Sequence, residues 1–97
     1  MDDKTYIFYK FDLMPEDQAE VLDAVKTLAV ETRKEPGCIS YMLTQDKISR
    51  NTFCFVECWA TEKDFEAHLE TAHYKAFEAL AGDKLENRLL SKLEQCV

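Results

Sequence analysis

The sequence has little glycine and no cluster of basic residues. Only two of its 97 residues are glycines, so the chain holds no glycine-rich loop of the kind that cradles phosphate groups. The net charge of −7 disfavours binding to the phosphate backbone of nucleic acids. The apolar runs are too short to span a bilayer, and the first residues do not resemble a signal peptide. We therefore expect a cytoplasmic protein with no nucleic-acid or membrane partner.

The four cysteines show neither a disulfide framework nor a metal-binding spacing. On one strand, Cys54 and Cys58 would lie about 13 Å apart at roughly 3.3 Å per residue, which is too far for a disulfide. Their spacing is also not that of a CxxC metal motif. We interpret the cysteines as reduced, buried, small apolar residues. A disulfide between Cys38 and Cys96 is an alternative.

Composition predicts three β-strands, at residues 5–11, 38–44 and 51–60, because each is rich in aromatic and β-branched residues. A polar turn at residues 45–51 makes the second and third an antiparallel hairpin. Side chains alternate across a strand, and the third strand is apolar on both faces except for one carboxylate. One face carries Phe53, Phe55, Glu57 and Trp59, and the other carries Cys54, Val56 and Cys58.

Helical spacing of apolar residues predicts a first helix over residues 15–34, with Pro15 in its first turn. A second helical region begins near Thr61, where Asp64 three residues later suggests a capping box. Thr71 could cap a further short helix, so we expect a break near Ala72. Gly82 ends this region. The pattern of residues 84–97 fits either a helix or a strand.

If the tail is a strand, the order is βαββαβ, which is the α+β ferredoxin-like arrangement of one antiparallel sheet with both helices on one face. The small residues Cys54, Val56 and Cys58 are expected beneath the helices. Phe53, Phe55 and Trp59 then occupy the open face of the sheet. A monomer that exposed such a patch would be prone to association, so the sequence predicts a homodimer formed through the open sheet face.

Several short segments together resemble the antibiotic biosynthesis monooxygenase family. They are Glu35-Pro36-Gly37-Cys38, Tyr41, Thr52-Phe53, Glu57-Cys58-Trp59, His68-Leu69 and His73-Tyr74-Lys75-Ala76-Phe77. The resemblance implies one domain over residues 1–97, a final strand in the tail, and a dimeric α+β barrel. It also implies, for some members, oxidation of phenolic or quinol substrates without metal, haem or flavin. Other members degrade haem, but residues 6–11 lack the asparagine of that branch.

Glu57 and His68 are the candidate catalytic residues. A carboxylate set between aromatic side chains should have a raised pKa, which suits a proton acceptor for a phenol or hydroxyketone. An ion pair across the dimer is the alternative for Glu57. His68 is a general base near neutral pH or a structural histidine bonded to a carbonyl or to Glu57. The candidate substrate-binding residues are Tyr41, Phe55, Trp59 and His73, with a structural role at a helix start as the alternative for His73.

The resemblance, taken with these residues, implies a cofactor-independent monooxygenase that acts on a small phenolic, quinol or enolisable molecule. One alternative is an isomerase of a small hydroxyketone, with or without a phosphate group, for which Lys10, Lys75 and Arg88 would supply positive charge. Another is a non-enzymatic dimer that binds small molecules or serves in a stress response. No metal site is expected, because His68 and His73 are five residues apart and do not share a helical face.

Overall fold

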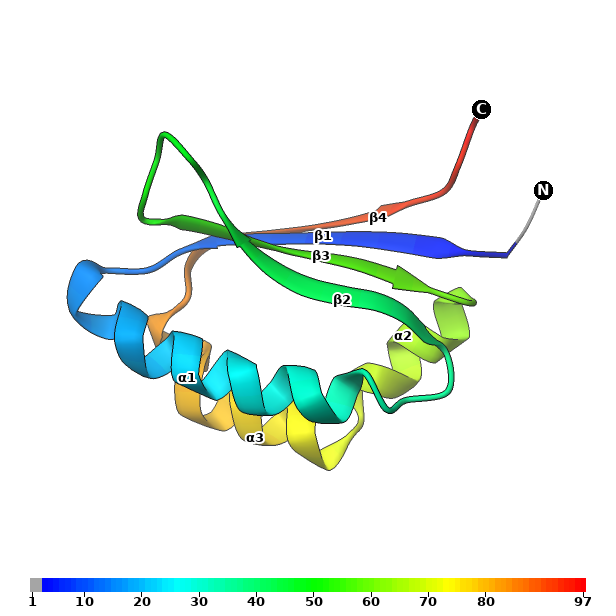
Figure 1. Ribbon diagram of the computed structural model, residues 1–97, viewed down its shortest axis with the longest axis horizontal. Coiled ribbons are helices and arrows are strands. Elements are labelled where there is room, and N and C mark those ends of the chain that lie inside the picture. Colours follow the sequence, from blue (N-terminus) through cyan, green and yellow to red (C-terminus); the bar gives the residue numbers. More distant parts are fainter. Residues whose placement is uncertain (1–2) are drawn as a thin grey trace.

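The computed structural model describes residues 3–97 and has the βαββαβ order of a ferredoxin-like α+β fold, with the second helical region split in two (Figure 1). The elements are β1 (Thr5–Asp12), α1 (Pro15–Thr32), β2 (Cys38–Gln45), β3 (Thr52–Trp59), α2 (Glu62–Leu69), α3 (Ala72–Ala81), the 3₁₀ helix η1 (Gly82–Lys84) and β4 (Glu86–Leu93). The fold class expected from the sequence is therefore confirmed.

The four strands form one antiparallel sheet in the order β2-β3-β1-β4. All three α-helices lie on one side of it (Figure 1). The tail is a strand, which resolves the ambiguity of its sequence pattern. It pairs with β1, and the register shifts between Lys10 and Asp12, next to Asn87 with its positive φ of 52°. Asn87 also donates a hydrogen bond from Nδ2 to Asp12 Oδ2 at 2.9 Å.

Threonine caps explain why the second helical region is two helices. Thr61 Oγ1 accepts a hydrogen bond from the backbone N–H of Asp64 at 3.1 Å, which begins α2. Thr71 Oγ1 accepts one from the backbone N–H of Tyr74 at 3.2 Å, which begins α3. The predicted break near Ala72 is confirmed. As a result, residues at the end of α2 and at the start of α3 face the same point from different directions.

The two faces of β3 are reversed relative to the sequence expectation. Phe53, Phe55 and Trp59 are buried beneath the helices, not on the open face. The Phe55 ring packs edge-on against Phe77 of α3, with ring centroids 6.1 Å apart. Trp59 packs against Phe65 of α2 at 6.3 Å. The space between helices and sheet is the core of the chain, and large side chains fill it to the density that protein interiors require.

The face of the sheet turned away from the helices is nevertheless largely apolar. The strand register places on it a set of partly or fully exposed side chains: Tyr6, Phe8, Met42, Cys54, Val56, Leu89 and Leu93. Phe8 is 45% exposed and Leu89 is 61% exposed. An unpartnered apolar face therefore exists as expected, although different residues of β3 contribute to it.

All four cysteines are free, so the alternative of a disulfide between Cys38 and Cys96 is wrong. Only Cys58 is fully buried, and Cys96 is exposed, so the expectation that all four are buried is also wrong. Within residues 3–97, no helix is both long enough and apolar enough to cross a membrane.

Candidate functional site

Glu57 lies in the middle of β3, between Ile7 of β1 and Tyr41 of β2 in the strand register. Its side chain points into the core, and the residue is only 4% exposed. The indole Nε1 of Trp59 donates a hydrogen bond to Glu57 Oε1 at 2.8 Å. Burial raises the pKa of the Glu57 carboxyl to about 7, the Trp59 hydrogen bond opposes this rise, and the negative charge of Glu35 adds to it. No ion pair within residues 3–97 includes Glu57.

His68, near the end of α2, is 1% exposed and lies among aromatic rings. Its ring centroid is 4.9 Å from that of Trp59, 5.0 Å from that of Tyr74 and 5.5 Å from that of Tyr41. Burial lowers the pKa of the imidazole below its usual value, and Glu35 opposes that shift. The hydrogen bond of His68 Nδ1 goes to Glu35 Oε2 at 2.7 Å, in place of the bond to Glu57 considered from the sequence.

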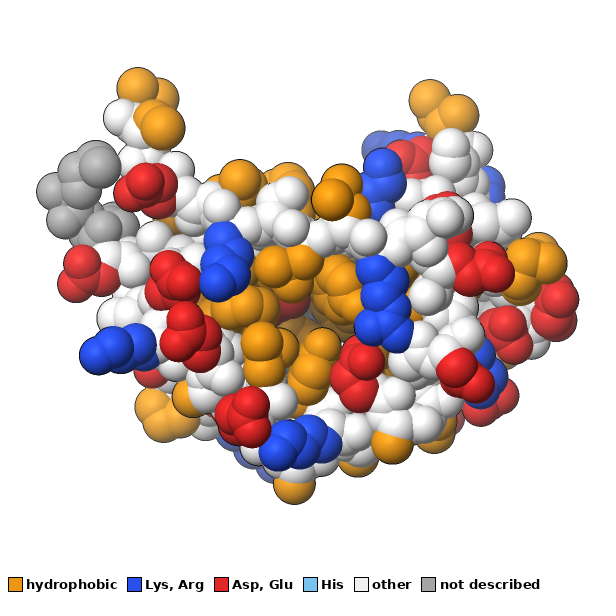
Figure 2. Space-filling view, turned by 180° about the vertical axis from the view of Figure 1, so that it is seen from behind, with side chains coloured by type: hydrophobic (Ala, Val, Ile, Leu, Met, Phe, Trp, Pro, Cys, Tyr) orange, Lys and Arg blue, Asp and Glu red, His pale blue; other side chains and the backbone are white. Residues whose placement is uncertain are grey.

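Glu57 and His68 nevertheless line one small cavity between the sheet and the helices. Its walls include Tyr9, Tyr41, Phe55 and Tyr74. Figure 2 shows the molecule from behind relative to Figure 1, and on this side hydrophobic side chains gather around a hollow in the surface. The cavity volume is about 10 Å³, which is room for about one water molecule.

The predicted substrate-binding residues take different positions around this cavity. Tyr41 and Phe55 line it. Trp59 is fully buried and holds the Glu57 carboxyl by its N–H. His73 does not line this cavity. It lines a separate groove between α1 and α3.

Tyrosine hydroxyls are a part of the cavity that the sequence did not single out beyond Tyr41. The Tyr9 hydroxyl accepts a hydrogen bond from Arg88 Nη1 at 3.2 Å, and Tyr74 donates one to Glu78 Oε2 at 3.4 Å. Burial raises the pKa of Tyr9, Tyr41 and Tyr74 above the usual range for tyrosine. These hydroxyls therefore stay protonated at neutral pH. Those of Tyr9 and Tyr41 can donate hydrogen bonds to a ligand oxygen, whereas Tyr74 already donates its proton to Glu78.

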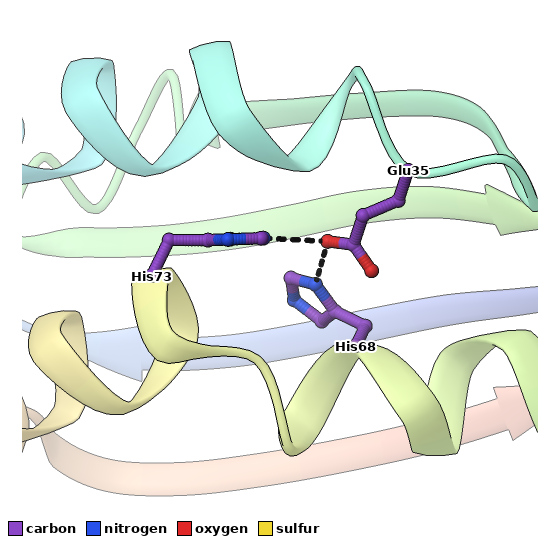
Figure 3. Close-up of side chains that lie close together, drawn as sticks. All are labelled: Glu35, His68 and His73. Atoms are coloured by element: carbon purple, nitrogen blue, oxygen red, sulfur yellow. Dashed lines mark hydrogen bonds and ion pairs between the residues drawn. The ribbon is translucent and has the colours of Figure 1, made fainter.

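A second cluster lies on the other side of His68 (Figure 3). Glu35 lies in the turn that follows α1. One of its carboxylate oxygens is hydrogen-bonded to both histidines of the chain. His68 Nδ1 and His73 Nε2 each lie 2.7 Å from Glu35 Oε2. Glu35 was not among the candidate site residues, because a single glutamate before a proline gives no periodic or spacing signal. The sequence does hold a weak signal, since Glu35 is part of the Glu-Pro-Gly-Cys segment that carries the family resemblance.

The fold and site together define a small α+β protein with an aromatic cavity, set between one antiparallel sheet and its helices, that contains a buried carboxyl group. The sequence profile described as "Antibiotic biosynthesis monooxygenase" matches residues 6–80. The chain belongs to the antibiotic biosynthesis monooxygenase family.

Two relatives with curated descriptions and two solved structures illustrate this membership. The chain is 33% identical over 75 residues to the Escherichia coli K12 protein named "Probable quinol monooxygenase YgiN", covering 68% of this chain and 72% of YgiN. It is 29% identical over 84 residues to the uncharacterized Synechocystis protein sll1783, covering 87% of this chain but only 57% of that relative. A Nitrosomonas europaea structure superimposes with a TM-score of 0.92 at 21% identity, covering 98% of this chain and 92% of that one. A Methanosarcina mazei structure gives 0.91 at 24% identity, covering 96% and 93%.

Proposed function

We propose that this chain is a cofactor-independent monooxygenase that oxidises a small phenolic, quinol or other enolisable molecule, with Glu57 as the proton acceptor. The observation that carries the proposal is the Glu57 carboxyl, which is buried on the wall of an aromatic cavity and has a pKa of about 7. Such a pKa suits proton transfer at neutral pH. The named relative YgiN supports the class of substrate.

The proposed reaction begins with transfer of the phenolic proton to the Glu57 carboxylate. The resulting phenolate is electron-rich at ring carbon, and that carbon forms a bond to dioxygen. Cleavage of the O–O bond leaves one oxygen atom on the ring as a quinone carbonyl, and the other oxygen atom leaves as water. The substrate supplies all the electrons, so one phenol and one dioxygen give one quinone and one water. Trp59 keeps Glu57 oriented towards the cavity, and neutral tyrosine hydroxyls can hold the substrate oxygen.

The size of the cavity sets a condition on this proposal. A volume of about 10 Å³ cannot hold an aromatic ring, so substrate entry requires part of the wall to move. Leu69 and Tyr74 lie on the two sides of the α2–α3 break, and Leu90 lies on the edge strand β4, so this part of the wall is the least enclosed by neighbouring elements. An outward shift of these residues would enlarge the cavity without disturbing the β1–β3 centre of the sheet.

The isomerase alternative needs positive charge beside the cavity, and one of its three candidate residues is near. Arg88 Nη1 bonds to the Tyr9 hydroxyl, but Arg88 also pairs with Glu78 at 3.2 Å. Lys10 is on the opposite face of the sheet from the cavity, and Lys75 pairs with Glu70 on the surface. Oxygen chemistry is therefore the better supported of the two, and turnover under anaerobic conditions would favour the isomerase.

We test the proposal by oxygen uptake with a panel of hydroquinones on protein treated with a chelator. The variant Glu57→Gln keeps an acceptor for the Trp59 N–H but removes the base, and should lower kcat by roughly 10²- to 10⁴-fold. The control Glu66→Gln makes the same chemical change at an exposed position of α2 and should leave kcat unchanged. Because the ionised carboxylate is the base, kcat/KM should rise with pH through about 7 in the parent protein only. Absence of oxygen uptake across the panel would favour a non-enzymatic binding protein. Equal kcat in both variants would rule out Glu57 as the proton acceptor.

We also propose that a second copy of this chain covers the open face of the sheet. The exposed apolar side chains on that face, Phe8 and Leu89 among them, form the kind of patch that soluble monomers avoid. A twofold axis parallel to the sheet, lying between the two open faces, would bury the same residues of both copies against each other. The cavity lies on the other side of the sheet, beneath the helices, so each copy would carry its own candidate site.

A further inference from the structure

Three side chains from different segments converge at the α2–α3 corner. Glu35 comes from the turn after α1, His68 from the end of α2 and His73 from the first turn of α3 (Figure 3). One oxygen of Glu35 and one nitrogen of each imidazole all lie within 4.8 Å of one another. Convergence from three elements places donor atoms around a point, which a run of ligands on one helix face does not do by itself.

These three donors suit a divalent transition-metal ion. Two imidazoles with one carboxylate is a donor set used by zinc and by iron in proteins, and it leaves coordination positions for solvent. A tetrahedral ion with bonds of about 2.0–2.2 Å keeps its ligand atoms about 3.3–3.6 Å apart. Each nitrogen is now 2.7 Å from Glu35 Oε2, so side-chain adjustments of less than about 1 Å would admit the ion.

The break between the helices removes the sequence objection to a metal. Five residues along one continuous helix would point His68 and His73 in different directions. Here the chain leaves α2 at Glu70 and restarts at Thr71, so the two imidazoles reach the same carboxylate by different ring nitrogens. Thr71 Oγ1 also donates to the backbone carbonyl of His68 at 2.7 Å, which fixes this corner.

The cluster combines a rigid ligand with an accessible one. His68 is 1% exposed, whereas the side chain of His73 is 23% exposed. His73 also lines a groove of about 340 Å³ between α1 and α3, whose walls include Glu20 and Asp23. Acidic side chains in that groove favour the approach of a cation, and the exposed side of His73 leaves room for water on the ion.

We propose that Glu35, His68 and His73 form a binding site for one divalent transition-metal ion, with His68 Nδ1, His73 Nε2 and a Glu35 carboxylate oxygen as ligands. The ion would join the turn after α1 to both α2 and α3, one ring away from the cavity that His68 also lines. The site does not depend on the proposed oxidation, because binding is measured without substrate.

Calorimetric titration of chelator-treated, reduced protein with zinc chloride tests the proposal. We expect one zinc per chain, no heat of binding with magnesium, and affinity lowered at least roughly 10–100-fold in Glu35→Gln and in His73→Gln. Glu66→Gln, at an exposed position on α2, is the charge-matched control and should bind as the parent does. His73→Gln changes a partly exposed side chain, so circular dichroism should show a folded variant.

Nitrogen-15 NMR of the imidazoles supplies a second test that a purely structural hydrogen-bonded cluster would not pass. The chain has only two histidines, so four ring nitrogens account for every imidazole signal. Zinc should shift Nδ1 of His68 and Nε2 of His73 and leave the other two nitrogens carrying protons. Absence of zinc binding would overturn the proposal, as would binding unaffected by both cluster variants. Loss of binding in Cys96→Ser, at an exposed thiol, would also overturn it by assigning the zinc to cysteine.

Discussion

Replacing Glu57 by glutamine should stabilise the fold at alkaline pH and leave its stability nearly unchanged at acid pH. The folded protein holds the Glu57 carboxyl at a pKa of about 7, whereas the ordinary value is 4.5. Between those two values the folded state binds a proton that the unfolded state has released. Raising the pH therefore favours unfolding in this window. Glutamine cannot ionise, and its amide oxygen can still accept the Trp59 hydrogen bond.

The magnitude follows from the size of the pKa difference. One pKa unit corresponds to about 1.36 kcal/mol, so a rise from 4.5 to about 7 corresponds to roughly 3 kcal/mol. The free energy of unfolding of the parent should fall by this amount between about pH 4.5 and 7 relative to the variant, and then stay level. The lowered pKa of His68 gives the opposite slope, since stability falls as the pH drops below its ordinary 6.5. That contribution is present in both proteins and cancels in their difference.

Urea unfolding of both proteins from pH 4.5 to 8.5, at one protein concentration, measures this difference. The single tryptophan, Trp59, is fully buried beside the mutated residue, so its fluorescence reports unfolding. Equal m-values in the two proteins would show that the variant keeps its fold. A stability difference that does not change with pH, or a variant less stable than the parent at pH 8.5, would refute the reasoning about the buried carboxyl.

Further predictions concern the turn before β2 and the open sheet face. Gly37→Ala should destabilise the fold by about 1–3 kcal/mol, because a Cβ at Gly37 would clash with Cγ and Cβ of Asp64. Gly82→Ala is the comparison variant, because a Cβ at Gly82 would lie 3.1 Å from its nearest neighbour, Oε1 of Glu78. Thermal unfolding that finds Gly82→Ala the more destabilised of the two variants would contradict this prediction. Phe8→Lys should convert a dimer to a monomer in sedimentation, whereas Val30→Lys, an equally apolar and exposed change on α1, should not. A dimer that survives Phe8→Lys would count against the sheet face as the interface.

The sequence pattern was sufficient for the order of elements up to Gly82, and the resemblance to the family favoured the final strand. The pattern was not sufficient for the side of the sheet that the helices cover. Caps, a proline and apolar spacing act locally, and the break at Thr71 followed from them. Alternation shows that Phe55 and Val56 lie on opposite faces, but it assigns neither face when both are apolar. Small residues were expected beneath the helices because they permit close approach. The helices instead stand over a layer of rings in which Phe55 meets Phe77.

The candidate site was predicted in part for a related reason. Glu57 could be identified from the sequence because it carries the one carboxyl group in an otherwise apolar strand. Glu35 gave no such contrast, because its role depends on partners 33 and 38 residues away. Contacts between distant segments are set by the packing of whole elements, and single-sequence patterns do not encode that packing. Both histidines were candidates, but a one-helix geometry hid their convergence.

The strand order β2-β3-β1-β4 has a consequence for how the chain can fold as it is synthesised. The β2–β3 hairpin joins neighbouring segments and can close early, within about 1–10 μs. The central strand β1, although made first, pairs on one side with β3 and on the other with β4, where Tyr6 meets Leu93. Until β4 leaves the ribosome, β1 is an open edge with unsatisfied backbone groups. The nascent chain is therefore most vulnerable to pairing with a neighbour before its last strand is available.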